Sequence, residues 1–141
     1  LSGRKINDKM HIYISKKILN FCKRNNINPK SSRVLQLGIT FKENCSDFRN
    51  SKSIDLHKLL IKNFKKVDIY DPIVDVNKFE FETNLKLTST TKNKKYDLIV
   101  ISTSHKLFNK NIDYSLLLKK NGFIFSIKPF NKIMHNIKIY S

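Results

Sequence analysis

Cysteine and glycine are scarce in this sequence, and each shortage excludes a class of site. The two cysteines, Cys22 and Cys45, are too few for a disulfide framework or for a zinc site built from cysteine. We therefore expect a reducing compartment, the cytoplasm. The glycines are Gly3, Gly38 and Gly122, so neither the Gly-x-Gly-x-x-Gly fingerprint of a dinucleotide-binding domain nor a P-loop is present.

Long apolar runs are also absent. No stretch approaches the ~18 consecutive apolar residues that a membrane-spanning helix requires, so we do not expect an integral membrane protein. Leu1 opens the chain in place of methionine, and no signal-peptide pattern follows it. We expect that the chain begins at a cut, made either in an experiment or in the gene.

Acidic residues are few: 11 Asp and Glu stand against 28 Lys and Arg, which gives a net charge of +17. Such a balance is typical of a nucleic-acid partner, and a basic nucleic-acid-binding module is one hypothesis. However, 24 of the basic residues are lysine and four are arginine, and they are spread along the chain. Phosphate recognition favours the arginine fork, so we expect no specific nucleic-acid binding, only nonspecific attraction to polyanions at low salt.

Hydrophobic periodicity predicts helices that alternate with short apolar strands. Asn25, Asn26 and Pro29 are expected to end the first helix, and Asn50 or Ser51 to cap the second. In chain order we predict a helix over about 1–26, strand 33–38, helix 51–64, strand 66–70, a short helix near 76–79, strand 85–87, strand 97–102, helix 113–120, strand 123–127 and a further strand within 133–140.

Strands that are continuous apolar runs between helices indicate a parallel sheet covered on both faces. The 141 residues suffice for one such domain with its own core. We therefore predict an α/β, Rossmann-like three-layer fold with a mainly parallel sheet, preceded by an N-terminal helix. Ligands of such sheets lie at the carboxyl ends of the strands, which points to the loops 39–50 and 102–108.

The loop 39–50 contains the parts of an anion site. Lys42 and Arg49 are cations, and the helix predicted from Ser51 directs its N-terminus at the same place. Phe41 offers an aromatic surface for a base or a sugar. The alternative is a solvated surface loop, and spacing alone favours that interpretation.

Other polar residues have simpler interpretations. His105 follows a predicted strand, where it either bonds a ligand or caps its loop. Asp47 is expected to pair with Arg49 or Lys42 and orient it, and Asp71 to bond a turn before a proline. His11, His57 and His135 have no Cys, Asp or His at metal-ligand spacing, so we expect no metal site.

The stretch 38–51 carries a family resemblance. It is similar to the signature that opens the C-terminal UDP-binding domain of the UDP-glucose/GDP-mannose dehydrogenase family, and it reads Gly-Ile-Thr-Phe-Lys-Glu-Asn-Cys-Ser-Asp-Phe-Arg-Asn-Ser. The segments 3–10, 70–72, 97–101 and 103–108 also resemble that family. The signature is most like that of the Vi-antigen type enzymes, which oxidise UDP-N-acetylhexosamines.

The resemblance implies a function and a division of the chain. Such enzymes oxidise C6 of a UDP-sugar to a UDP-uronate in two NAD-dependent steps, which supplies polysaccharide precursors. It implies that 1–28 is the end of a central helix that builds a homodimer and that 29–141 is the UDP-binding domain. The catalytic cysteine and the NAD domain lie upstream in the family, so Cys45 is not the nucleophile, the chain holds no catalytic residue, and we expect it to be inactive alone.

The resemblance also implies roles for single residues. Phe41 and Lys42 contact the UDP-sugar, Lys128 lies close to the active cleft, and Arg49 reaches the NAD of the other domain. The sequence departs from the family pattern after the last strand, where Ser126 replaces an acid and Pro129 follows Lys128. A non-catalytic remnant is therefore a further hypothesis.

Overall fold

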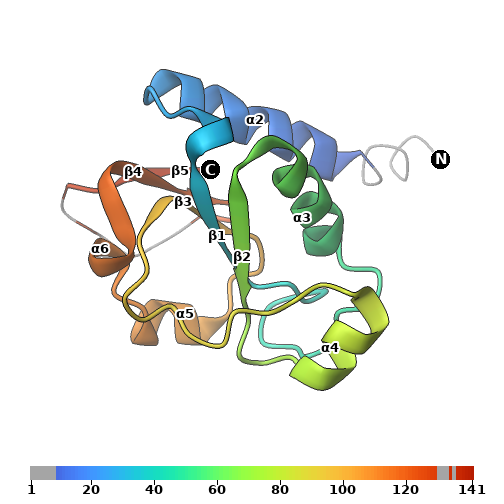
Figure 1. The fold of residues 1–141 in the computed structure, drawn as a ribbon. Helices are drawn as coiled ribbons and strands as arrows, with labels where there is room; N and C mark the ends of the chain where they lie inside the picture. The colour runs from blue at the N-terminus through green and yellow to red at the C-terminus, as the bar shows by residue number, and fades with distance from the viewer. Residues whose placement is uncertain (1–8, 130–133, 135) are drawn as a thin grey trace.

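The computed structural model describes residues 9–129, 134 and 136–141, and it contains a five-stranded parallel sheet in the order β2-β1-β3-β4-β5 (Figure 1). The elements are α2 Met10–Arg24, the 3-10 turn Pro29–Ser31, β1 Arg33–Leu37, α3 Lys52–Asn63, β2 Lys66–Tyr70, α4 Val76–Thr83, β3 Tyr96–Ile101, α5 Lys106–Asn111, α6 Tyr114–Leu117, β4 Leu118–Ser126 and β5 Lys138–Tyr140. This arrangement confirms the predicted α/β, Rossmann-like class with its leading helix.

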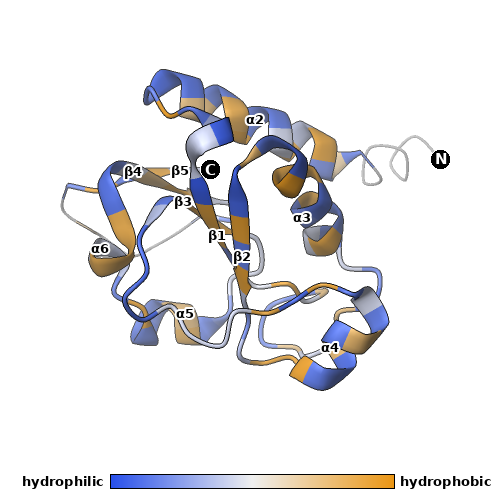
Figure 2. Ribbon diagram, viewed as in Figure 1, coloured by the Kyte–Doolittle hydropathy of each residue, from blue (hydrophilic) through white to orange (hydrophobic). Residues whose placement is uncertain are grey.

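Alternate side chains of the strands point to opposite faces of the sheet, and each face is covered by helices. Val34 and Leu98 lie in one hydrophobic cluster with α2 and α3. Their neighbours Leu35 and Ile99 lie in a second cluster with α5 and α6. The central strands β1 and β3 are therefore largely apolar on both sides, and Figure 2 shows hydrophobic residues along the strands and a mixture of hydrophobic and hydrophilic residues along the helices.

Helices α2 and α3 have identifiable anchors and ends. Ile18 and Cys22 of α2 are fully buried against the sheet, and burial raises the pKa of the Cys22 thiol to about 12. Asn25 ends α2, and the Ser51 hydroxyl caps α3 by accepting from the Ser53 N–H at 3.1 Å. Both helix ends confirm the prediction, whereas residues 1–8 of the first predicted helix lie outside the described part of the chain.

The strand order reverses between β1 and β3, and the two strand ends approach each other closely there. Gly38 follows β1 with a φ of +85°, and a Cβ at this position would lie 2.3 Å from the Thr103 carbonyl oxygen. A side chain would therefore clash with the backbone and strain its own. Such a reversal is the switch point at which parallel α/β sheets bind ligands. It lies between the two strands that precede the predicted ligand loops, 39–50 and 102–108.

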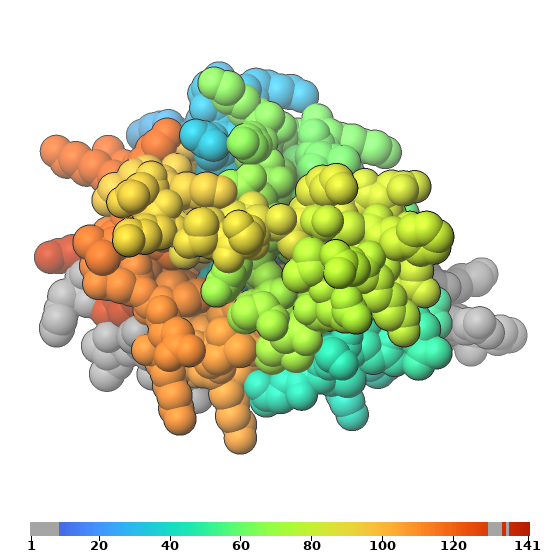
Figure 3. Space-filling view, turned by 60° about the horizontal axis from the view of Figure 1, so that its bottom comes forward, coloured from blue at the N-terminus to red at the C-terminus, as the bar shows by residue number. Residues whose placement is uncertain are grey.

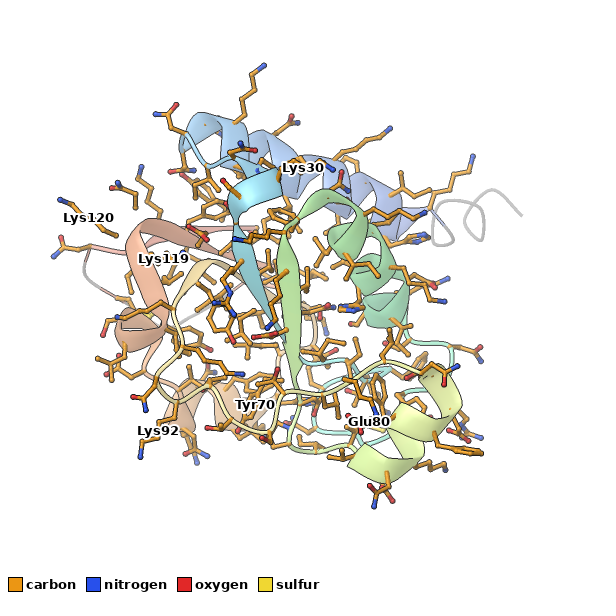
Figure 4. All side chains as sticks on the ribbon, in the orientation of Figure 1. Lys30, Tyr70, Glu80, Lys92, Lys119 and Lys120 are labelled. Atoms are coloured by element: carbon orange, nitrogen blue, oxygen red, sulfur yellow. The ribbon has the colours of Figure 1, made fainter. Side chains whose placement is uncertain are left out.

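The strand predicted at 85–87 is wrong, because the amide groups of this segment bond to side chains. The Leu85 N–H donates to Thr83 Oγ1 at 3.2 Å, and the Leu87 N–H donates to the carboxylate of Glu80 on α4 at 2.8 Å. Figure 4 shows Glu80 on that helix. The apolar side chains still pack on the core, which explains the strand-like pattern.

The helix predicted at 113–120 is also wrong in extent. Helix α6 ends at Leu117, and β4 begins at once, so Asn121 and Gly122 lie inside a strand and not at a helix end. Asn121 has a φ of +70°, and the register of β4 against β3 shifts in this region. Asn121 and Gly122 therefore accommodate an irregularity of the strand. Asn and Gly are suited to such an irregularity as well as to a helix end. Helix α5 was not predicted.

Candidate functional site

A pocket of about 240 Å³ lies at the carboxyl edge of the sheet, beside the switch point. Three groups of elements form it: the start of α2, the loop after β1 with the start of α3, and the ends of β3 and β4. The lining residues are Met10, His11, Ile14, Phe41, Lys42, Glu43, Lys52, Ser53, Leu56, residues 101–104, Ile127 and Lys128. Phe41, Lys42 and Lys128, which the sequence predicts as binding residues, are thus brought together.

The loop after β1 is fixed by hydrogen bonds at Thr40. Its carbonyl oxygen accepts from the hydroxyls of Ser51 and Thr103, each at 3.0 Å, and its own hydroxyl donates to the Lys42 carbonyl oxygen at 2.9 Å. The next residue, Phe41, is 61% exposed, so its ring is available for contact at the pocket.

The part of the same loop that leads into α3 is anchored by packing against the core. Phe48 is buried and meets the ring of Phe79 from α4 edge-on, with centroids 5.1 Å apart. Figure 3 shows the loop in cyan beside α4 in yellow-green. The pocket residues therefore stand on a loop that is held both by hydrogen bonds and by the core.

Cations dominate the charge of the pocket. Among the described residues, Lys42, Lys52 and Lys128 line it together with the carboxylate of Glu43. Lys128 donates a hydrogen bond to that carboxylate, and this bond lowers the pKa of Glu43 below its ordinary value. The first turn of α3 adds the positive end of a helix dipole through Lys52 and Ser53. The arrangement suits an anionic ligand.

Lys128 reaches the pocket although the segment departs from the family pattern. The Ile127 N–H donates to the Ile101 carbonyl oxygen at 3.1 Å, which continues the alignment of β4 with β3. Ser126 is buried, and its hydroxyl turns back to the Lys128 carbonyl oxygen at 2.5 Å. Ser126 therefore serves the local turn and leaves the Lys128 side chain directed at Glu43.

Arg49 does not line the pocket. Its guanidinium holds the Asp47 carboxylate through two hydrogen bonds of 3.0 Å on the exposed side of the loop. This pairing was one of the two expected for Asp47, and it lowers the pKa of Asp47 to about 2. Cys45, on the same loop, is half-buried with a free thiol.

His105 is fully buried and bonds to its own surroundings, not to the pocket. Its ring lies between the Asp71 carboxylate and the backbone of Asn44, so it ties the loop after β3 to the loops after β2 and β1. Of the two interpretations left open by the sequence, the structure supports the one in which His105 holds a loop.

Sequence reasoning missed the α2 wall of the pocket and its first α3 residues. His11 stands on this wall, and its Nδ1 is buried with no hydrogen-bond partner in the part of the chain that the structure describes. Lys52 and Ser53 follow directly on the capping Ser51 and could have been found from that cap. The contribution of α2 had no local signal, because it depends on how the helix crosses the sheet.

Metal clusters and membrane-spanning helices are both absent from the described residues. Within those ranges, no three His, Cys, Asp or Glu side chains gather in a way that could hold a metal ion. None of the helices described here combines the length and hydrophobicity needed to cross a bilayer.

Comparison with known proteins gives consistent matches. The model of the UDP-glucose/GDP-mannose dehydrogenase family, UDP binding domain, matches residues 35–132. UDP-N-acetyl-D-glucosamine 6-dehydrogenase of Salmonella typhi is 41% identical over 110 residues, which cover 78% of this chain and 26% of the relative. Protein CapL of Staphylococcus aureus is 34% identical over 129 residues, covering 91% of this chain and 30% of CapL.

Solved structures agree at the level of the fold. The UDP-D-ManNAc dehydrogenase of Pyrococcus horikoshii superposes with a TM-score of 0.79 at 22% identity, covering 97% of this chain and 31% of that protein. The chain thus spans between a quarter and a third of the length of the proteins that it matches.

Proposed function

Because this chain belongs to the UDP-glucose/GDP-mannose dehydrogenase family and matches its UDP-binding domain, we propose that the pocket at the switch point holds the UDP part of a nucleotide sugar. One observation carries the proposal. Phe41 and Lys42, which follow β1, and Lys128, which follows β4, line one pocket at the carboxyl edge of the sheet.

The chemistry of each side chain fits a part of UDP. The exposed ring of Phe41 offers a flat apolar surface for the uracil or the ribose. Lys42 and Lys128 supply positive charge for the diphosphate, to which the start of α3 adds its dipole. The pocket volume of about 240 Å³ is below the ~300–1,000 Å³ of a complete small-molecule site, which supports a site that other parts of the protein complete.

For the complete protein, the proposed activity is the NAD-dependent oxidation of a UDP-sugar to a UDP-uronate, a step that prepares polysaccharide precursors in the cytoplasm. The names of the relatives, UDP-N-acetyl-D-glucosamine 6-dehydrogenase and UDP-N-acetyl-D-mannosamine dehydrogenase, favour a UDP-N-acetylhexosamine. The catalytic cysteine and most of the NAD site belong to parts of the protein outside this chain. Arg49, exposed on the loop, is the residue that we expect to reach NAD, and the chain alone should produce no NADH.

The proposed division of the chain places the end of a dimer-forming central helix at 1–28 and the UDP-binding domain at 29–141. The family match begins at residue 35, after α2. Met10, Ile12 and Tyr13 are 39%, 40% and 62% exposed on α2, which supports a second copy of the protein as the partner of this helix.

Calorimetric titration of the chain with UDP tests the binding proposal at ~150 mM salt, where nonspecific attraction is screened. We expect Lys42→Ala and Lys128→Ala each to weaken binding by about tenfold, the effect of losing one charge-assisted hydrogen bond. Lys92→Ala is the matched control, because Lys92 is exposed in a loop away from the pocket (Figure 4).

Two outcomes would contradict the proposal. If Lys42→Ala and Lys128→Ala bound UDP as tightly as the control Lys92→Ala, Lys42 and Lys128 would not belong to the site. Tight binding of duplex DNA with no response to UDP would favour the nucleic-acid hypothesis that the net charge of +17 raises.

A further inference from the structure

The imidazole of His105 lies where three loops meet at the carboxyl edge of the sheet. Its side chain is fully buried, with Nδ1 2.9 Å from the backbone nitrogen of Asn44 and Nε2 2.9 Å from Asp71 Oδ2. Asn44 belongs to the loop after β1, Asp71 to the loop after β2, and His105 to the loop after β3.

The hydrogen-bond partners of the ring determine which of its two nitrogens carries the proton. A backbone N–H can only donate, so Nδ1 must present its lone pair to Asn44. The proton of the neutral ring is then on Nε2, from which it is donated to the Asp71 carboxylate. The Asp71 carboxylate also accepts from the backbone N–H of Ile39 at 2.8 Å and from that of Ile73 at 3.0 Å, so three donors hold it in place in the buried site.

These bonds hold the far end of the segment that carries the pocket residues. Asn44 has a φ of +60°, its backbone N–H donates to His105, and its side-chain oxygen accepts from the Lys106 N–H at 2.9 Å. The near end is held at Thr40 by Ser51 and Thr103. Residues 41–43 therefore lie between two fixed points of the loop.

We propose that His105 is a positioning residue for nucleotide binding: its Nδ1 lone pair fixes Asn44 and so holds Phe41 and Lys42 in the conformation that receives the ligand. This inference rests on the proposed function of the pocket. His105 touches no ligand itself, because its ring is fully buried and outside the pocket lining. The loop is therefore already ordered when the protein folds, so the free energy of ligand binding is not reduced by the cost of ordering the loop.

Two isosteric substitutions separate this role from a merely structural one. In His105→Asn the amide oxygen takes the place of Nδ1 and can still accept from Asn44, whereas the bond to Asp71 is lost. In His105→Gln the amide reaches the place of Nε2 and can still donate to Asp71, whereas the acceptor for Asn44 is lost. Each variant loses one short buried bond, and His105→Asn also loses the 3.4 Å contact of Nε2 with Thr40 Oγ1, so both should lower the melting temperature.

The affinity for UDP-N-acetylglucosamine should depend on whether the variant keeps the hydrogen bond to Asn44, and not on how far its melting temperature falls. We expect about a tenfold weaker affinity in His105→Gln and a change within about twofold in His105→Asn, measured by calorimetry well below the melting temperatures. Cys22→Ala, a buried substitution at the far end of α2, is the control for lost stability alone.

Hydrogen exchange of the Asn44 amide gives a readout that does not depend on the ligand. It should be faster in His105→Gln and close to wild type in His105→Asn. Equal exchange rates in the two variants, or equal affinities, would overturn the inference. Failure of the wild-type chain to bind UDP would overturn the proposed function, while the exchange rates would still decide whether His105 holds the loop.

Discussion

A second buried histidine, His57 on α3, should make the stability of the domain fall in mild acid. Its side chain is buried, and its Nδ1 lies 3.0 Å from Gln36 Oε1. The Gln36 amide nitrogen donates to the Ser53 carbonyl oxygen and to Ser102 Oγ, so Oε1 is the acceptor and Nδ1 of His57 carries the proton. Protonation at the other ring nitrogen would place a charge in this buried network.

Burial lowers the pKa of His57 from 6.5 to about 4. The unfolded chain therefore binds the proton more readily than the folded one, and stability is lost as the pH falls from the unfolded pKa towards the folded one. Between about pH 7 and pH 5 the linkage relation gives a loss of about 2 kcal/mol, and the complete loss, reached below about pH 4, is about 3 kcal/mol.

Urea unfolding followed by circular dichroism at several pH values measures this loss. His57→Asn can still donate to Gln36 but cannot titrate in this range, so its stability should depend less on pH, by about 2 kcal/mol between about pH 7 and pH 5. His11→Gln controls for a histidine outside the network. If the wild type and His57→Asn lost the same free energy over this range, the reasoning would be refuted. A ring titration by NMR, showing His57 charged at about pH 5 in the folded wild type, would refute it as well.

Two further predictions follow from the switch point and the pocket. Gly38→Ala should lower the free energy of unfolding by roughly 3 kcal/mol or more, because the added Cβ meets the Thr103 carbonyl oxygen and the positive φ is strained; a urea midpoint close to that of the wild type would count against it. Glu43→Gln should raise the affinity for UDP two- to fivefold, roughly the value of an exposed ion pair, because it frees Lys128. Calorimetry checks this, and the gain should shrink when Lys128→Ala is added, to the part that comes from relieved repulsion between the Glu43 carboxylate and the diphosphate; a gain of unchanged size would show that Lys128 is not the cation involved.

The sequence by itself determined the elements whose signals are local. The central strands β1 and β3 appear as largely apolar runs because both of their faces are buried, and the caps at Asn25 and Ser51 follow from the chemistry of helix ends. The signature 38–51 likewise lies in one continuous segment, so the order of its residues is enough to indicate the family and the candidate loop. Predictions were wrong where one local pattern serves two structures, as at 85–87 and at Asn121.

The tertiary structure decided which of these segments meet. Lys128 and Glu43 are 85 residues apart, and His105 lies 61 residues from Asn44 and 34 from Asp71. The α2 wall of the pocket is likewise distant in sequence from the loop that it faces. Periodicity and capping report on neighbours within a few residues along the chain. Contacts at the edge of a parallel sheet depend instead on strand order and on helix crossing, and both are set when the whole core packs together.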